Sequence, residues 1–253
     1  MDIKVKGKTV LVTGGSRGIG RHVALQYAAE GAKVAITYNE RSDLTDAIVA
    51  DIKSRGGEAM ALRMQLGSEE SVRNTVAEVG KAFGGVDILI NNAVRWAERL
   101  QQNQVLFEDT PGQEWREVLR HNIEGAYAAI QAVLPHMREK KWGRIINVSS
   151  MIAISGSPGN GTYGAAKSAL HGLTRSVAKE VGRDGILVNV VAPGLVVTER
   201  NLERVPQFVR DGASKASSIG YVLPPEEIAP IIVFLGSGLN TGTTGQIVTC
   251  SGS

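Results

Sequence analysis

Three side chains in the segment 147–167, NVSSMIAISGSPGNGTYGAAK, have the types and spacing for acid–base chemistry on a carbonyl group. Tyr163 and Lys167 are four positions apart in a predicted helix, so both project from one face, one turn apart. An ammonium group there favours the phenolate and brings a phenol, whose ordinary pKa is about 10, closer to working pH. Ser150 follows an apolar strand and is placed to hold a carbonyl oxygen. Taken alone, the Tyr–Lys spacing is also typical of a solvated helix face.

A second group of residues, near the N-terminus, is typical of a nucleotide-binding turn. The sequence predicts a strand at 8–12, a glycine-rich turn TGGSRGIG at 13–20 and then a helix. Gly14, Gly18 and Gly20 permit a tight turn, close approach of the backbone and close packing of the helix. The first N–H groups of that helix are suited to a pyrophosphate. The sequence therefore predicts a nucleotide site at the end of the first strand.

Together, the glycine loop, Ser150 and the Tyr163–Lys167 pair resemble the short-chain dehydrogenase/reductase family over nearly the whole chain. NNAV at 91–94 resembles the N-N-A-G signature of that family, with Val94 in place of glycine. The resemblance implies a single α/β domain over 1–253, built on a doubly wound parallel sheet (Rossmann-type) of about seven strands with helices on both faces. It also implies a substrate lid at about 195–224 and NADPH-dependent reduction of a ketone to a secondary alcohol, which is reversible.

The same resemblance assigns four catalytic residues. Tyr163 is expected to supply the proton, and Ser150 to orient and polarise the carbonyl. Lys167 is expected to lower the pKa of the tyrosine and to bind the nicotinamide ribose. Asn122 is expected to hold a relay water, with a helix cap as the alternative. Asn91 is expected beneath the cofactor, and the residues expected to bind it are Gly14, Ser16, Arg17, Gly18, Ile19, Gly20, Tyr38, Asn39, Arg41, Gln65, Leu66, Asn92, Tyr163, Lys167, Pro193, Gly194, Val196 and Thr198.

The end of the second predicted strand, 33–37, favours NADP (NADPH) over NAD. Tyr38 stands where NAD-specific relatives usually have an acid, so no carboxylate at that position repels a 2′-phosphate. Arg17 and Arg41 are expected to pair with that phosphate. Glu40 offers an acid for the ribose hydroxyls, so NAD-linked oxidation of a secondary alcohol stays the alternative. A non-catalytic cofactor-binding subunit, and a lyase or dehalogenase on the same scaffold, are further alternatives.

The segment 95–112, RWAERLQQNQVLFEDTPG, is long, rich in Gln and, by the resemblance, close to the substrate mouth. Trp96 and Phe107 are candidates to line a pocket for a bulky ketone of secondary metabolism. Ordinary burial of apolar loop residues explains both of them equally well. The small-molecule carbonyl substrate therefore stays unidentified at this point.

Composition limits the class of protein and its partners. The 28 basic and 25 acidic residues give a net charge of +3 without a basic stripe, so nucleic-acid binding is not expected. Because no segment is typical of a leader or a membrane span, we expect a cytoplasmic protein with no membrane contact. Cys250 is the single cysteine, which excludes an intrachain disulfide and a multi-cysteine metal site; no metal is expected. Small residues at 125–129 favour a homo-oligomer, a homodimer or homotetramer, by the resemblance, and intramolecular packing would give the same pattern.

Overall fold

The structure, a computed structural model, describes residues 2–96 and 106–252. At its centre is a seven-stranded sheet with the order β3-β2-β1-β4-β5-β6-β7, in which all neighbouring strands are parallel. The strands are β1 (Thr9–Val12), β2 (Lys33–Tyr38), β3 (Glu58–Arg63), β4 (Ile88–Asn91), β5 (Gly143–Val148), β6 (Ile186–Pro193) and β7 (Ile247–Cys250). The predicted doubly wound α/β sheet is confirmed.

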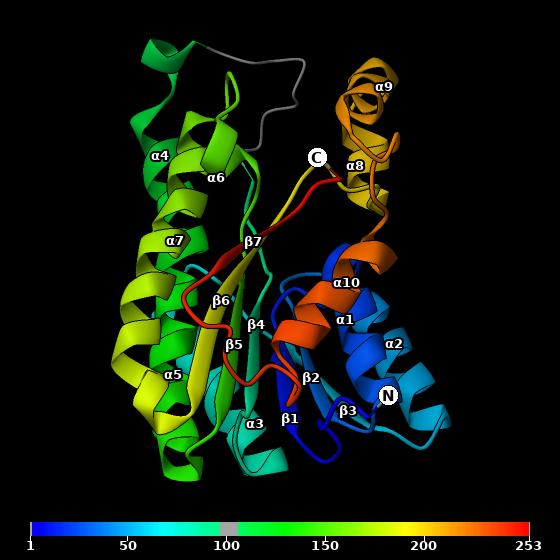
Figure 1. The fold of residues 1–253 in the computed structure, drawn as a ribbon, viewed down its shortest axis with the longest axis vertical. Coiled ribbons are helices and arrows are strands. Elements are labelled where there is room, and N and C mark those ends of the chain that lie inside the picture. The colour runs from blue at the N-terminus through cyan, green and yellow to red at the C-terminus, as the bar shows by residue number, and fades with distance from the viewer. Residues whose placement is uncertain (1, 97–105, 253) are drawn as a thin grey trace.

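Helices cover both faces of the sheet, and each face has its own apolar core (Figure 1). One face carries α1 (Gly18–Ala29), α2 (Ser42–Ser54) and α10 (Pro225–Leu235). The other carries α3 (Glu69–Phe83), α5 (Gly125–Lys140) and α7 (Gly161–Val181). Because β1, β4, β5 and β6 are covered on both sides, every residue of these strands is buried. The shorter helical segments are η2 (Phe107–Asp109), α4 (Gly112–Leu119), the π-helical turn η3 (Arg120–Glu124), α6 (Ile152–Ser155), η4 (Gly182–Asp184), α8 (Glu199–Arg204) and α9 (Gln207–Ala216).

The sequence predicts a helix over 161–181 and a strand over 186–193, and α7 and β6 have these bounds, whereas β3 differs from its prediction. We expect the third strand to run from 59 to 66, but β3 ends at Arg63. The chain leaves the sheet there because the Gln65 N–H donates to Ser71 Oγ at 2.9 Å and the Ser68 N–H donates to Gln65 O at 3.0 Å. These bonds form a turn ahead of α3. Ser68 caps α3 as predicted, since its hydroxyl accepts from the Ser71 N–H.

The small residues of α5 pack within the chain. A Cβ on Gly125 would lie 2.5 Å from Leu66 O, so only glycine permits this approach. Ala126, Ala128 and Ala129 are buried in the same subunit. Intramolecular packing therefore accounts for this pattern, and the homo-oligomer stays a prediction.

Membrane and metal sites gain no support from the part of the chain that the structure describes. None of its helices combines the length and the apolar character that crossing a bilayer requires. Over residues 2–96 and 106–252, no three His, Cys, Asp or Glu side chains gather in a metal-binding arrangement.

A buried chain of polar side chains joins β4, β5 and α7. Asn91 Nδ2 donates to Asn147 Oδ1 at 2.9 Å, and Asn147 Nδ2 donates to Thr174 Oγ1 at 2.8 Å. All three side chains are buried. Because an unpaired buried polar group costs free energy, these bonds fix the position of α7 against the two strands. Asn91 is therefore a structural residue that does not line the cavity described below, and its expected place beneath the cofactor stays a prediction.

Replacing Thr174 by Val keeps the side-chain shape and removes the acceptor of the Asn147 amide. We expect Thr174→Val to lower the free energy of unfolding by about 1–3 kcal/mol, the cost of a buried donor left unpaired. Urea denaturation measures this change. Thr249→Val makes the same chemical change at an exposed position of β7 and is expected to alter stability by less than about 0.5 kcal/mol. Equal stabilities of the two variants would contradict the role of the polar chain.

Candidate active site

A cavity of about 1020 Å³ lies at the carboxyl ends of the central strands. The strand order reverses between β1 and β4, and open α/β sheets bind ligands at this point. All of the predicted catalytic and cofactor-binding residues line this cavity except Gly20 and Asn122. The sequence therefore located the cavity correctly, from residues in widely separated segments.

The glycine loop has the shape of a cradle for a pyrophosphate. Gly14 has φ +66°, and a Cβ on it would lie 2.8 Å from Ala93 Cα. Gly20 lies behind the loop, where a Cβ would approach Asn92 Nδ2 to 2.5 Å, so its role is helix packing. Arg17, the N-cap residue of α1, makes no side-chain cap bond, and the Gly18 N–H donates to the Glu199 carboxylate at 3.1 Å. Backbone N–H groups at this helix N-terminus are suited to an anion, so the residues present fit a dinucleotide.

Thr13 fastens the glycine loop to the segment after β4. Its Oγ1 accepts from the N–H groups of Asn92 and Ala93, both at 2.9 Å. Asn92 Nδ2 donates in return to Thr13 O at 2.9 Å. Val94, the departure from the family signature, does not have a positive φ. A β-branched residue is therefore compatible with the loop at this position.

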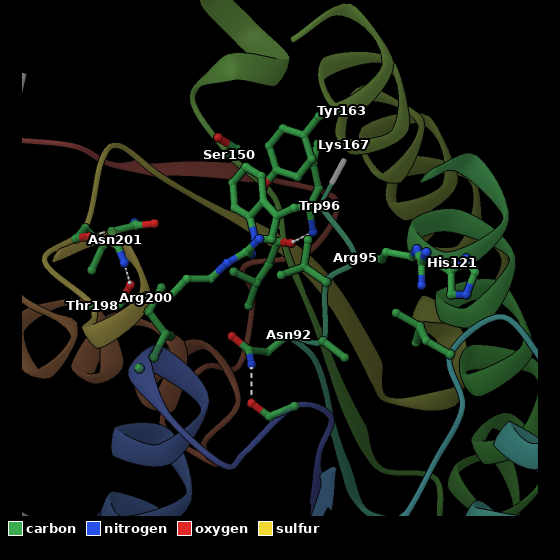
Figure 2. A pocket seen from close by; sticks show the side chains of 18 of the residues that line it. Asn92, Arg95, Trp96, His121, Ser150, Tyr163, Lys167, Thr198, Arg200 and Asn201 are labelled. Carbon is green, nitrogen blue, oxygen red and sulfur yellow. Dashed lines mark hydrogen bonds between the residues drawn. The ribbon is translucent and has the colours of Figure 1, made fainter. Parts of the chain in front are cut away.

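Ser150, Tyr163 and Lys167 are brought together, and all three are buried (Figure 2). The Ser150 side chain lies close enough to the Tyr163 hydroxyl to lower its pKa. Lys167 Nζ lies 5.9 Å from the centre of the Tyr163 ring and donates to Val148 O at 2.8 Å. Ser149, by contrast, donates to Lys167 O at 3.1 Å and has the role of a structural neighbour that we expected.

Burial is the main influence on the protonation states of Tyr163 and Lys167. It raises the pKa of the Tyr163 phenol, while the nearby Ser150 side chain and the positive charge of Arg200 lower that pKa by less. It also lowers the pKa of the Lys167 ammonium to about 8. At neutral pH the phenol is therefore protonated and suited to donate a proton. The groups that lower the phenol pKa here are Ser150 and Arg200, so the expected influence of Lys167 on it stays a prediction.

Asn122 supports the cavity from behind. It lies in the π-helical turn η3, where its Nδ2 donates to Arg95 O at 2.7 Å and to Val118 O at 2.8 Å. Its Oδ1 accepts from the Arg95 N–H at 3.2 Å. A π-helical turn, rather than a helix cap, thus joins α4 to α5. Asn122 fixes the backbone next to Trp96, and its relay role stays a prediction.

Trp96 lies against Tyr163. Its ring stacks on that of Tyr163 with centroids 4.1 Å apart and planes inclined by 20°. The Arg200 guanidinium carbon lies 5.1 Å from the Trp96 ring centre, so the indole contacts both side chains (Figure 2). Phe107, the other predicted pocket residue, is 79% exposed and does not line the cavity. Half of the segment 95–112, residues 97–105, lies outside the described residues.

The predicted 2′-phosphate site contains two arginines in different situations. Arg41 makes two hydrogen bonds to the Asp43 carboxylate, at 2.9 and 2.7 Å, on the protein surface. Arg17 is exposed at the cavity and makes no ion pair with any described residue. Gln65 also lines the cavity, in the turn after β3. Arg17 is therefore the arginine better placed to meet a ligand phosphate.

Comparison with known proteins agrees with this geometry. The profile of the short chain dehydrogenase family matches residues 8–207. A 3-oxoacyl-(acyl-carrier-protein) reductase FabG of Staphylococcus epidermidis is 35% identical over 97% of this chain and 98% of its own length. The FabG of Aquifex aeolicus is 34% identical over 100% of this chain and 99% of its own. The chain belongs to the short-chain dehydrogenase family.

Solved structures of this family have the same fold. A short chain dehydrogenase of Burkholderia cenocepacia, in complex with NADP, matches with a TM-score of 0.89 and 33% identity, covering 99% of this chain and 98% of that one. A dehydrogenase/reductase of Sinorhizobium meliloti matches with the same TM-score and identity, over 99% and 96%. The protein is thus an NAD(P)-dependent short-chain oxidoreductase acting on CH–OH and C=O groups.

Sequence analysis of this short-chain dehydrogenase missed two residues of the site. Thr13 is the first residue of the T-G-x-x-x-G-x-G pattern, and that position was the available signal. Arg200 had no signal, because its importance comes from its surroundings: it lines the cavity, half-buried, beside Trp96.

Burial of Lys167 predicts a pH dependence of stability for this dehydrogenase. The ammonium pKa is about 8 in the folded state against an ordinary 10.5, so the unfolded state binds more protons between these values. The penalty for burying the cation is complete below that window and disappears as the pH rises through it. We expect the unfolding free energy of the wild type, relative to Lys167→Met, to rise by about 1.4 kcal/mol per pH unit. Urea denaturation between about pH 7 and 10 measures the difference, and a constant difference would contradict this account.

Proposed function

We propose that this chain reduces a small-molecule ketone to a secondary alcohol with NADPH. The observation that carries the proposal is a buried, protonated Tyr163 that lines the same cavity as Ser150 and the glycine loop. The names of the FabG relatives, which are 3-oxoacyl reductases, support the direction of reduction. The NADP bound in the Burkholderia cenocepacia structure supports the cofactor.

The roles of the residues follow from their contacts. NADPH, when bound, supplies the hydride chemistry. The Ser150 hydroxyl donates a hydrogen bond to the carbonyl oxygen and fixes its position. Tyr163 Oη donates its proton to the same oxygen as negative charge develops on it. Lys167, one turn further along α7, stabilises the resulting phenolate when it is charged, and Asn122 is proposed to hold the relay water that returns the proton.

One observation favours the NAD-linked oxidation of an alcohol as the second candidate. Asp43 holds Arg41, and Glu40 lines the cavity as an acid for ribose hydroxyls. The narrower prediction of a bulky ketone of secondary metabolism rests on Trp96 alone, and none of the relatives reported above is named for such a substrate. The lid at about 195–224, the single domain, the cytoplasmic location and the homodimer or homotetramer stay predictions.

Tyr163→Phe tests the proton donor. The change removes the hydroxyl and keeps the ring that stacks on Trp96. We expect kcat for ketone reduction to fall by about 100-fold or more, the contribution of a general acid, while the Kd for NADPH changes little. Tyr127→Phe, on the exposed side of α5, is the matched control. Turnover of Tyr163→Phe at the level of the control would refute the role.

Arg17→Met tests the cofactor preference. Titrations followed by nicotinamide fluorescence are expected to show tighter binding of NADPH than of NADH by the wild type. Loss of one charge-assisted bond to a phosphate should weaken NADPH binding by about 10-fold and spare NADH. Arg21→Met, one turn further along α1 and outside the cavity, is the control for loss of charge. Preference of the wild type for NADH would favour the oxidation of alcohols instead.

A further inference from the structure

Arg200 is a half-buried cation in the cavity wall without an anionic partner in the described chain. No carboxylate in residues 2–96 or 106–252 lies within ion-pair distance of its guanidinium, and no hydrogen bond joins it to these residues. Burial first, and then the positive charges of Arg204 and Arg17, lower its pKa to about 10, and Tyr163 raises that pKa by less. Cations removed from water are normally paired with an anion. Among the described residues, Arg200 therefore lacks the anionic partner that a half-buried cation normally has, and an anionic ligand would supply it.

The residues beside Arg200 already have partners. The carboxylate of Glu199 accepts from the Gly18 N–H at 3.1 Å. Thr198 caps α8 by accepting from the Asn201 N–H at 3.2 Å, and Asn201 Nδ2 donates to Val196 O at 2.9 Å. These bonds hold the backbone at the start of α8. The five N–H donors of Arg200 take no part in them, so its side chain is not needed to build the segment.

Arg200 also lies at a defined separation from the proton donor. The Trp96 ring contacts both Arg200 and Tyr163, so one aromatic ring separates the guanidinium from the phenol (Figure 2). The charge of Arg200 reaches the phenol, since it lowers the pKa of Tyr163. Because the guanidinium carbon lies 5.1 Å and the Tyr163 ring centre 4.1 Å from the Trp96 ring centre, a ketone and an anionic group at opposite ends of one aryl ring fit this spacing.

We propose that the carbonyl substrate carries an anionic group, a carboxylate or a phosphate, which pairs with Arg200 while the ketone lies at Ser150 and Tyr163. This inference rests on the proposed ketone reduction and adds the class of substrate. Arg200 determines specificity, and Trp96 sets the distance between the anion and the reacting carbon. The guanidinium favours both anions because its planar donors match their oxygen atoms.

A matched set of ketones tests the inference by steady-state kinetics with NADPH. The probes are 4-acetylbenzoate, its neutral methyl ester and 4-acetylphenyl phosphate. The ester removes the negative charge and keeps the ring, and the phosphate replaces the carboxylate by the other anion. For the wild type we expect kcat/KM for at least one anion to exceed that of the ester by about 10-fold or more. The difference should appear mainly in KM, because Arg200 binds a part of the substrate that does not react.

Variants at residue 200 assign that preference to one side chain. Arg200→Met should lower the ratio of anion to ester kcat/KM by about 10- to 100-fold, and Arg200→Lys should restore part of it. Arg183→Met removes an exposed charge next to η4, outside the cavity, and should keep the wild-type ratio. Calorimetric titration with 4-acetylbenzoate, with and without NADP⁺, gives the same comparison for binding alone.

The outcomes separate the two proposals. Equal kcat/KM for anions and ester in a wild type that reduces them overturns the anion site and leaves ketone reduction standing. Arg200-dependent binding of 4-acetylbenzoate without reduction of any probe supports the anion site and counts against the proposed reduction. Weaker NADPH binding by Arg200→Met, with an unchanged anion-to-ester ratio, would assign Arg200 to the cofactor and overturn the inference.

Discussion

The reversal of strand order at β1 determines where everything else in this protein lies. β1 pairs with β2 on one side and with β4 on the other, so the connections that follow these strands diverge to opposite faces of the sheet. The crevice between them receives the glycine loop after β1 and Ser150 after β5. Residues that are more than a hundred positions apart in the chain thereby face one cavity, and the order of the strands alone brings them there.

Burial away from water then determines the protonation states of Tyr163 and Lys167. The same physical cause favours the neutral form of both Tyr163 and Lys167, although it moves their pKa values in opposite directions. Burial of this kind is tolerated because the polar groups have partners: Lys167 with the backbone of β5, and Asn147 with both Asn91 and Thr174. The same buried hydrogen bonds thus hold α7 in place and allow Tyr163 and Lys167 to be buried in their neutral forms.

Periodicity and spacing predicted the helix that contains Tyr163 and Lys167, and the resemblance to the short-chain dehydrogenase/reductase family added the doubly wound sheet and the choice of Ser150. The bounds of α7 and the positions of Ser150, Tyr163 and Lys167 needed no knowledge of tertiary contacts. The early end of β3 depends on a side chain six residues further on, Ser71, which no strand pattern contains. Arg200 is harder still to predict, since its significance lies in the absence of a carboxylate within ion-pair distance among residues 2–96 and 106–252.

The π-helical turn η3 makes the length of the chain at this point as important as its residue types. A π-helical turn holds one residue more than an α-helical turn, and here it connects α4 to α5 without a break. Deletion of one residue from it would rotate α5 by about 100° about its axis relative to α4. The alanines that pack on α3 would then turn towards solvent, and Asn122 would lose its hold on the backbone of Arg95. A change in chain length within η3 is therefore expected to disrupt the packing of α5, because it changes the orientation of that helix about its own axis.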